Sequence, residues 1–144
     1  MIFPASKDRL LKALKGESPL NKILKIGLVT KSQNEELNII RKSKGWNERE
    51  TRIITMNQND VIHILKRIEI DKLTPEEVIL IAEHAFSESS DVNVGYNSRA
   101  LLENPTDSSI EDNIFTARAV LIDGQNYTNY RLYGLIPKGW KGRK

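Results

Sequence analysis

The sequence contains no cysteine, so disulfide bonds, thiolate catalysis and cysteine-ligated zinc sites are all excluded. Only two histidines occur among the 144 residues, which is few for a transition-metal site. No apolar run approaches the roughly 20 residues that a membrane helix needs. The opening MIFPASKDRL has no long apolar stretch behind a basic head, so we expect no secretory signal peptide in it. These absences favour a soluble chain that uses no thiol chemistry.

The length of 144 residues matches one domain and is enough to bury a core without help from a metal or disulfides. We expect residues 1–144 to form a single domain, with a helical N-terminal part over 1–45 and a second part over 50–144. The net charge is only +3, but it is unevenly distributed. Residues 1–31 hold seven basic residues against two acids, and residues 131–144 hold five basic residues and no acid. Both ends are therefore cationic.

The first thirty residues predict one helix and one segment of undecided type. Ser6 is a candidate cap for a helix that runs through residues 9–14 and is closed by Gly16. The following segment, LNKILKIGLV at 20–29, starts with helical spacing but ends in residues that suit a strand. Its type stays open.

Two more helices are indicated by caps and apolar spacing. Residues 32–43 form one, with Ser32 and Glu35 as a loose match to a capping box. The sequence TPEE at 74–77 starts another, with threonine as cap, proline in the first turn and glutamate reaching back. That helix is expected to end near Phe86.

Strands are predicted from β-branched residues and turn signals. TRIITM at 51–56 suits a strand of about five residues that leads into an Asn/Asp cap. After Ser87 turns dominate, with one short strand expected around 92–96 or 98–102. Four nearby carboxylates match no calcium loop and are expected in a solvated loop: Glu103, Asp107, Glu111 and Asp112.

Residues 113–136, NIFTARAVLI, DGQN and YTNYRLYGLI, predict a β-hairpin, because Asp-Gly tolerates positive φ. A turn centred on 123–124 or on 124–125 gives registers that differ by two residues, so the faces are the same in both. One face suits a core that helices cover: Phe115, Ala117, Ala119, Leu121, Leu132 and Ile136. The other face carries polar side chains: Thr116, Arg118, Asn129, Arg131 and Tyr133.

This polar face is a candidate phosphate-binding surface, because arginine offers a planar fork of donors to phosphate oxygens. The alternative is an ordinary solvent face of an antiparallel sheet. Trp140 in the tail lies among cations, as in single-stranded nucleic-acid surfaces. The alternative is a frayed basic terminus with this indole folded back on the body. The cations around it are Lys138, Lys141, Arg143 and Lys144.

The segment DVIHILKR, residues 60–67, contains one of the two histidines. His63 falls outside the apolar face of this predicted helix and lies beside Lys66 and Arg67. We expect it to face away from the main apolar stripe, among cations that lower its pKa from about 6.5. A plain surface histidine is the alternative, and His84 is expected to be an ordinary helix-face residue.

The order of elements, with D-x-x-H-I-x-x-R in a helix and a late hairpin near a basic end, resembles the barnase/EndoU/colicin/RelE superfamily of small RNA endonucleases. That group includes phage-encoded nuclease domains and toxin domains of contact-dependent inhibition systems. The resemblance covers roughly residues 50–144. It implies an α+β fold, with N-terminal helices packed on one face of a small antiparallel sheet that ends in a C-terminal hairpin. Ile68-Glu69 stand where His-Gly often follows the arginine, which puts the role of His63 in question.

The resemblance implies metal-independent RNA cleavage that uses the substrate's own 2′-hydroxyl and no cofactor. Such an enzyme supplies a proton acceptor, a proton donor and cations around the phosphate. The expected catalytic residues are His63 as acid or base, Thr116 as a phosphate donor, Arg118 and Arg131 as cations, and Tyr133 as base stacker or proton donor. The expected RNA-binding residues are Arg67, Asn129, Lys138, Trp140, Lys141 and Arg143.

Two other classes stay open. A non-catalytic nucleic-acid-binding or phage accessory protein would use the same cationic surface. The second open class is a toxin inhibitor or other partner-binding protein. Inhibitors of cationic nucleases are usually acidic, so the basic ends of this chain favour a toxin over an inhibitor. A toxin would act on tRNA or other RNA in the cytoplasm and bind an acidic immunity protein, with no membrane partner. Delivery from another cell within a larger exported protein fits that role.

Overall fold

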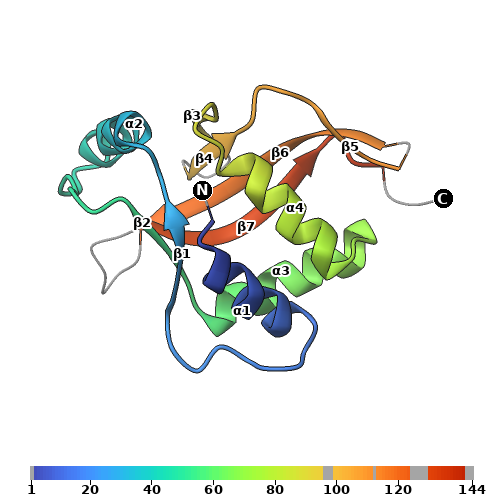
Figure 1. Cartoon of the computed structure of the whole chain (residues 1–144). Helices are drawn as coiled ribbons and strands as arrows, with labels where there is room; N and C mark the ends of the chain where they lie inside the picture. Colours follow the sequence, from blue (N-terminus) through green and yellow to red (C-terminus); the bar gives the residue numbers. More distant parts are fainter. Residues whose placement is uncertain (1, 96–98, 112, 124–129, 142–144) are drawn as a thin grey trace.

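A computed structural model describes residues 2–95, 99–111, 113–123 and 130–141, apart from the side chains of 123, 130–133 and 135–137. Helices and strands alternate along the first half of the chain, and strands follow in the second half (Figure 1). The elements are α1 Pro4–Leu14, β1 Leu24–Leu28, α2 Lys31–Ser43, β2 Ile53–Met56, α3 Gln58–Asp71, α4 Pro75–Ala85, β3 Asp91–Val94, β4 Ala100–Glu103, β5 Ser108–Ile110, β6 Asn113–Asp123 and β7 Tyr130–Lys138.

The strands form a sheet in the order β1-β2-β7-β6-β4-β3, and β5 pairs with β6 beside this path. All described pairs are antiparallel except β2 and β7, which run parallel where Ile54 pairs with Tyr130 and Thr55 with Arg131. The predicted α+β class with a C-terminal hairpin is confirmed. The sheet is otherwise antiparallel, as predicted, and β2 and β7 can run parallel because a long crossover joins them.

The covered face of β6 belongs to the core of the molecule. Helix α4 packs on β6 and β7, and α1 packs on α4 and β1 (Figure 1). Burying a large apolar side chain contributes about 1.5–3 kcal/mol, so this face stabilises the sheet against the helices. The prediction for this face of β6 is confirmed, since four alternating residues are at most 1% exposed: Phe115, Ala117, Ala119 and Leu121. The side chains of Leu132 and Ile136 lie outside the description.

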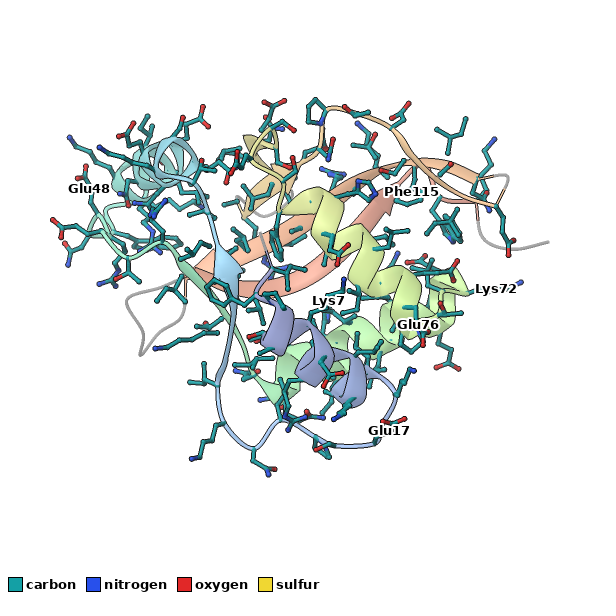
Figure 2. All side chains as sticks on the ribbon, viewed as in Figure 1. Lys7, Glu17, Glu48, Lys72, Glu76 and Phe115 are labelled. Carbon is teal, nitrogen blue, oxygen red and sulfur yellow. The ribbon has the colours of Figure 1, made fainter. Side chains whose placement is uncertain are left out.

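Two ion pairs join α1 to α4. Lys7 contacts Glu83, and Lys15 Nζ lies 2.7 Å from Glu76 Oε1 (Figure 2). The hydrogen bond between Lys15 and Glu76 raises the pKa of Lys15 and lowers the pKa of Glu76. Both groups are solvent-exposed, so these pairs orient the two helices more than they stabilise them. None of the described helices is long and apolar enough to cross a membrane.

The predicted caps are correct for α4 but not for α2. In α4, Thr74 and its partner three residues on bond each other's backbone N–H, as the sequence predicts. Helix α2 begins one residue earlier than expected, with Thr30 and Gln33 as the capping pair. The loose match of Ser32 and Glu35 is therefore wrong, because the better pair lies two residues upstream.

The predicted cap of the first helix is also wrong. Helix α1 starts at Pro4, and Ser6 lies inside it, where its hydroxyl donates to the Lys25 carbonyl at 2.6 Å. Gly16, with φ of +74°, follows the end of the helix as predicted. The undecided segment 20–29 contains strand β1, so the N-terminal part is not purely helical.

Residues 87–111 hold more regular structure than the sequence indicates. Both places considered for a single short strand are occupied, by β3 and by β4, which pair with each other. β5 lies where a loop was expected and pairs with β6. Glu103 belongs to β4, so the prediction of one solvated acidic loop is wrong at this residue. Asp112 lies outside the described residues.

The hairpin of β6 and β7 is present, but its predicted turn is wrong. Asp123 pairs with Tyr130, so residues 124–129 connect the strands instead of a two-residue turn. These six residues lie outside the description. Asp-Gly favours a tight turn locally, but the longer connection is set by pairing further along the strands.

The register of the hairpin changes once. Val120 pairs with Gly134, whereas Leu121 pairs with Leu132, so β7 has one extra residue at this point. Arg118 pairs with Ile136, whereas the two-residue turns predict Asn129 or Arg131 as its partner. Most of this difference arises because Asp123 pairs with Tyr130, and the extra residue moves the partner by one more position. A shift of this kind has no signal in the alternation of β6 alone.

Candidate functional site

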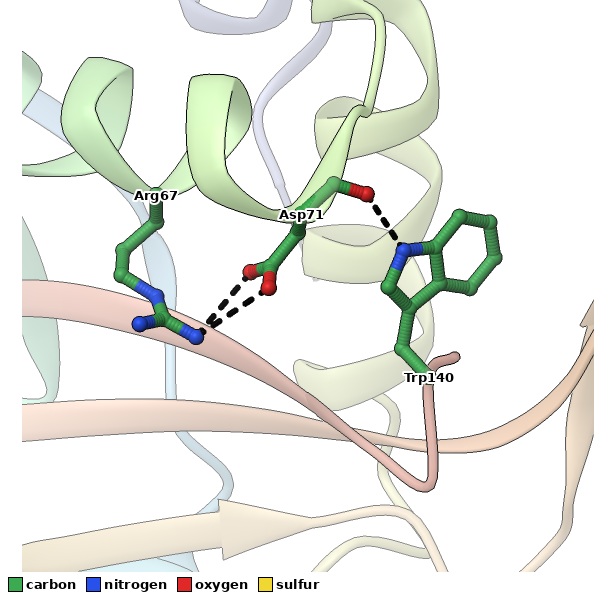
Figure 3. A network of polar contacts seen from close by, with 3 residues as sticks. All are labelled: Arg67, Asp71 and Trp140. Carbon is green, nitrogen blue, oxygen red and sulfur yellow. Dashed lines mark hydrogen bonds and ion pairs between the residues drawn. The ribbon is translucent and has the colours of Figure 1, made fainter. Parts of the chain in front are cut away.

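His63 packs against strand β7. Helix α3 starts where Asn57 and Asp60 cap each other, and it lies next to β7 (Figure 3). A Cβ atom at Gly134 would lie 3.5 Å from His63 Cδ2 and 3.6 Å from His63 Nε2. The imidazole thus lies over the backbone of β7 and is half-buried. His63 lies among cations, as expected, and no sequence signal indicates that strand β7 lies against this side of α3.

Burial and nearby cations lower the pKa of His63 from its ordinary value of 6.5. Burial has the largest effect, followed by the charges of Lys66 and Arg99, while Asp60 raises the pKa and Arg67 lowers it further. A lowered pKa keeps the imidazole neutral at pH 7, where it can accept a proton. The same cations attract an anion toward the ring.

Arg99 is the residue near His63 that sequence reasoning missed. It immediately precedes β4, and its carbonyl accepts a hydrogen bond from Gly95 N at 2.7 Å. More than thirty residues separate it from His63 along the chain. No local pattern relates the two, because the fold alone brings the guanidinium close enough to affect the imidazole.

The predicted site residues of β6 have acidic partners. Thr116 Oγ1 donates to Asp107 Oδ1 at 2.9 Å. Arg118 Nε lies 2.7 Å from Glu103 Oε2, across the backbone pair that joins β6 to β4. Both side chains of this ion pair are about one quarter exposed, at 23% and 24%. A phosphate that approaches Arg118 must therefore compete with a carboxylate.

Arg67 and Trp140 meet at one aspartate. The guanidinium of Arg67 pairs with the carboxylate of Asp71 at 3.2 Å, and the indole N–H of Trp140 donates to the Asp71 backbone carbonyl (Figure 3). The indole also makes an edge contact with Phe115, with ring centroids 5.7 Å apart at 82°. Trp140 is thus folded back on the body, which supports the structural alternative over a stacking role.

The structure describes only some of the other predicted site residues. Lys138 and Lys141 are exposed, and Lys138 pairs with Thr116 across the hairpin. The backbone of Arg131 pairs with Ile122, and Tyr133 immediately precedes Gly134, but these two side chains are outside the description. Asn129 and Arg143 also lie outside the described residues.

The predicted residues therefore fall into two groups. His63 lies beside the position of Gly134, and the charges of Lys66, Arg67 and Arg99 act on its imidazole. Arg118 lies two residues along β6 from the partner of Gly134, a backbone separation of about 7 Å. In the part of the chain that the structure describes, no three His, Asp and Glu side chains gather as metal ligands.

Comparisons with protein families, characterised proteins and solved structures found no match for this chain.

Proposed function

We propose that this chain is a metal-independent RNA endonuclease whose proton acceptor is His63. The observation that carries the proposal is the half-buried imidazole over Gly134, with a lowered pKa and the charges of Lys66 and Arg99 close by. A neutral base beside cations is what the attack of a hydroxyl on a phosphodiester requires. The sequence resemblance to small RNA endonucleases points to the same chemistry.

In the proposed reaction His63 accepts the proton of the substrate 2′-hydroxyl while the 2′-oxygen attacks phosphorus. The bond from phosphorus to the 5′-oxygen breaks, and that oxygen takes a proton from Tyr133, the chain neighbour of Gly134. The products are a 2′,3′-cyclic phosphate and a 5′-hydroxyl, and the enzyme is restored when the proton on His63 passes through solvent to the tyrosinate of Tyr133, with no net proton consumed. Lys66 and Arg99 stabilise the charge on the phosphate oxygens.

The biological role that fits this chemistry is that of a toxin domain. Its targets would be tRNA or other RNA in the cytoplasm of the cell, reached by delivery from another cell within a larger exported protein. An acidic immunity protein would cover the cationic surface, with a salt-sensitive association rate. Expression at high level without a partner, with no effect on growth, would contradict this role.

The test is cleavage of total tRNA and mRNA by purified protein in EDTA. Removal of a general base costs about 10²–10⁴-fold in rate, so His63→Ala should abolish visible fragments. His84→Ala is the matched control, because it removes the other histidine, which lies in α4. Equal fragments from the wild type and His63→Ala would remove the catalytic assignment.

A non-catalytic nucleic-acid-binding protein is the second candidate. This function is favoured because three of the predicted site residues contact carboxylates within the fold: Arg67, Thr116 and Arg118. Intact RNA under conditions where a salt-dependent gel shift appears, unchanged by His63→Ala, would favour this function.

A further inference from the structure

The two tryptophans of the chain have opposite environments. Trp140 is half-buried and bonded to Asp71, whereas Trp46 is 48% exposed. The ammonium of Lys44 lies 5.3 Å from the centroid of the Trp46 ring. Exposed tryptophan is uncommon, because burying this side chain stabilises a fold, so its position on the surface needs a reason.

The backbone holds Trp46 in place at the end of α2. Gly45 has φ of +76°, a conformation that ends a helix and favours glycine. Gly45 N donates to the Lys42 carbonyl at 3.1 Å, and Trp46 N donates to the Arg41 carbonyl at 2.9 Å. The backbone of Trp46 is thus fixed to the helix by the hydrogen bonds of its C-terminal cap.

The segment after Trp46 is also held by side chains of α2. Asn38 bonds both backbone groups of Arg49, with Nδ2 to the carbonyl at 2.8 Å and the amide to Oδ1 at 2.9 Å. Asn34 Nδ2 donates to the same carbonyl at 3.0 Å. Two asparagines therefore fix an irregular loop, residues 44–52, which we name the Trp46 loop. A loop held in this way loses little entropy on binding.

The Trp46 loop and the last turn of α2 carry more positive than negative charge. Lys42 and Arg52 are exposed, and Lys44 and Arg49 are half-buried, while Glu48 and Glu50 are exposed. With Arg41, which is buried, this segment holds five basic and two acidic residues, a balance of three positive charges in the segment that carries the exposed indole. An aromatic ring among cations matches the bases and phosphates of a single strand, because every base has a face that stacks.

We propose that Trp46 is the surface on which a base of single-stranded RNA stacks, with Lys44 and the arginines of the Trp46 loop on its phosphates. This inference rests on the proposed function, since the ligand is taken to be the substrate RNA. The loop continues directly into β2 and then into α3, the helix of His63. The Trp46 loop is therefore joined to the helix of His63 through one strand of four residues.

The experiment uses the two tryptophans as separate reporters. In a His63→Ala background, so that RNA stays intact, Trp140→Phe leaves Trp46 as the single tryptophan, and Trp46→Phe leaves Trp140. Each protein is titrated with a twelve-nucleotide oligouridylate while tryptophan emission is recorded. We expect saturable quenching when Trp46 is present and none from Trp140, because a stacked base quenches indole emission.

A second readout does not depend on Trp140→Phe folding well. In the His63→Ala background with Trp140 kept, Trp46→Ala should weaken binding of the same oligonucleotide about tenfold with the same salt slope, because stacking is lost and phosphate contacts remain. Lys44→Gln should instead reduce the slope of log K against log salt by about 0.7. The two variants separate stacking from charge.

Quenching of Trp46 emission, together with a tenfold loss of oligonucleotide affinity in Trp46→Ala, would support base stacking on Trp46, whether or not the wild type cleaves RNA. Oligonucleotide binding without quenching, and with unchanged affinity in Trp46→Ala, would overturn it even if His63-dependent cleavage is found. Absence of any binding would also overturn it. RNA cleavage is measured separately, so failure of the stacking proposal and failure of the nuclease proposal are distinguishable.

Discussion

Replacing Trp140 by phenylalanine tests whether the C-terminal indole is part of the folded body. In the wild type its N–H donates to the Asp71 carbonyl, and its ring meets the edge of Phe115 (Figure 3). Phenylalanine keeps a ring but has no N–H, so the carbonyl loses its donor. A hydrogen bond of this kind contributes about 1 kcal/mol, and the smaller ring adds to the loss. We expect Trp140→Phe to lower the free energy of unfolding by about 1–2 kcal/mol.

Trp140→Ala removes the ring as well. Aromatic pairs contribute about 0.5–1.5 kcal/mol beyond their buried area, and truncation of a buried tryptophan costs about 3–5 kcal/mol. Because Trp140 is only half-buried, we expect a total loss of about 2–4 kcal/mol. A double-mutant cycle with Phe115→Leu isolates the ring contact, with an expected coupling of about 0.5–1.5 kcal/mol.

The assay is urea unfolding followed by far-ultraviolet circular dichroism. Trp46→Phe is the matched control, since that ring is 48% exposed and its change should stay within about 0.5 kcal/mol. An unfolding midpoint in Trp140→Phe equal to that of the wild type would refute the reasoning. It would return this tryptophan to the candidates for base stacking.

Two further predictions concern the sheet and His63. Arg118→Met should lower the free energy of unfolding by about 1 kcal/mol, because it leaves the half-buried carboxylate of Glu103 without its cation. Adding Glu103→Gln to this variant should recover part of that loss. Urea midpoints of the two single variants and the double variant check this, and strict additivity would contradict it. The folded pKa of His63 lies below its ordinary value of 6.5, so as the pH falls the unfolded chain binds this proton first. The stability that the neutral imidazole contributes is fully present above pH 6.5 and is lost as the pH falls through the folded pKa. Between about pH 8 and pH 5 the wild type should therefore lose more free energy of unfolding than His63→Gln.

Features that depend on residues close together in the chain were predicted from the sequence. Thr74 starts α4 because its partner lies three residues away, and the alternation along β6 places Phe115 and Leu121 in the core. The same locality explains the error at Ser6, which has the right chemistry for a cap. There the proline two residues earlier starts the helix, and the hydroxyl bonds a neighbouring strand instead.

Features that depend on distant residues were not predictable. The extra residue in β7 between the partners of Val120 and Leu121 depends on the pairing of the whole hairpin. The position of Arg99 near His63 and the return of Trp140 to α3 depend on packing across the fold. For the candidate site, the sequence indicated His63 and its neighbouring cations, but neither the strand that covers the imidazole nor the carboxylates that engage the arginines.

The parallel pair of β2 and β7 has a consequence for how the sheet closes. Ile54 pairs with Tyr130, so about half of the chain lies between the two strands that meet at the centre of the sheet. Such a distant contact forms slowly, because a long loop must close before the pairing stabilises it. Until β7 is in place, β1 with β2 and β6 with β4 and β3 are two separate pieces. His63 then has no strand beneath it, so the candidate site is complete only once β7 has joined the sheet.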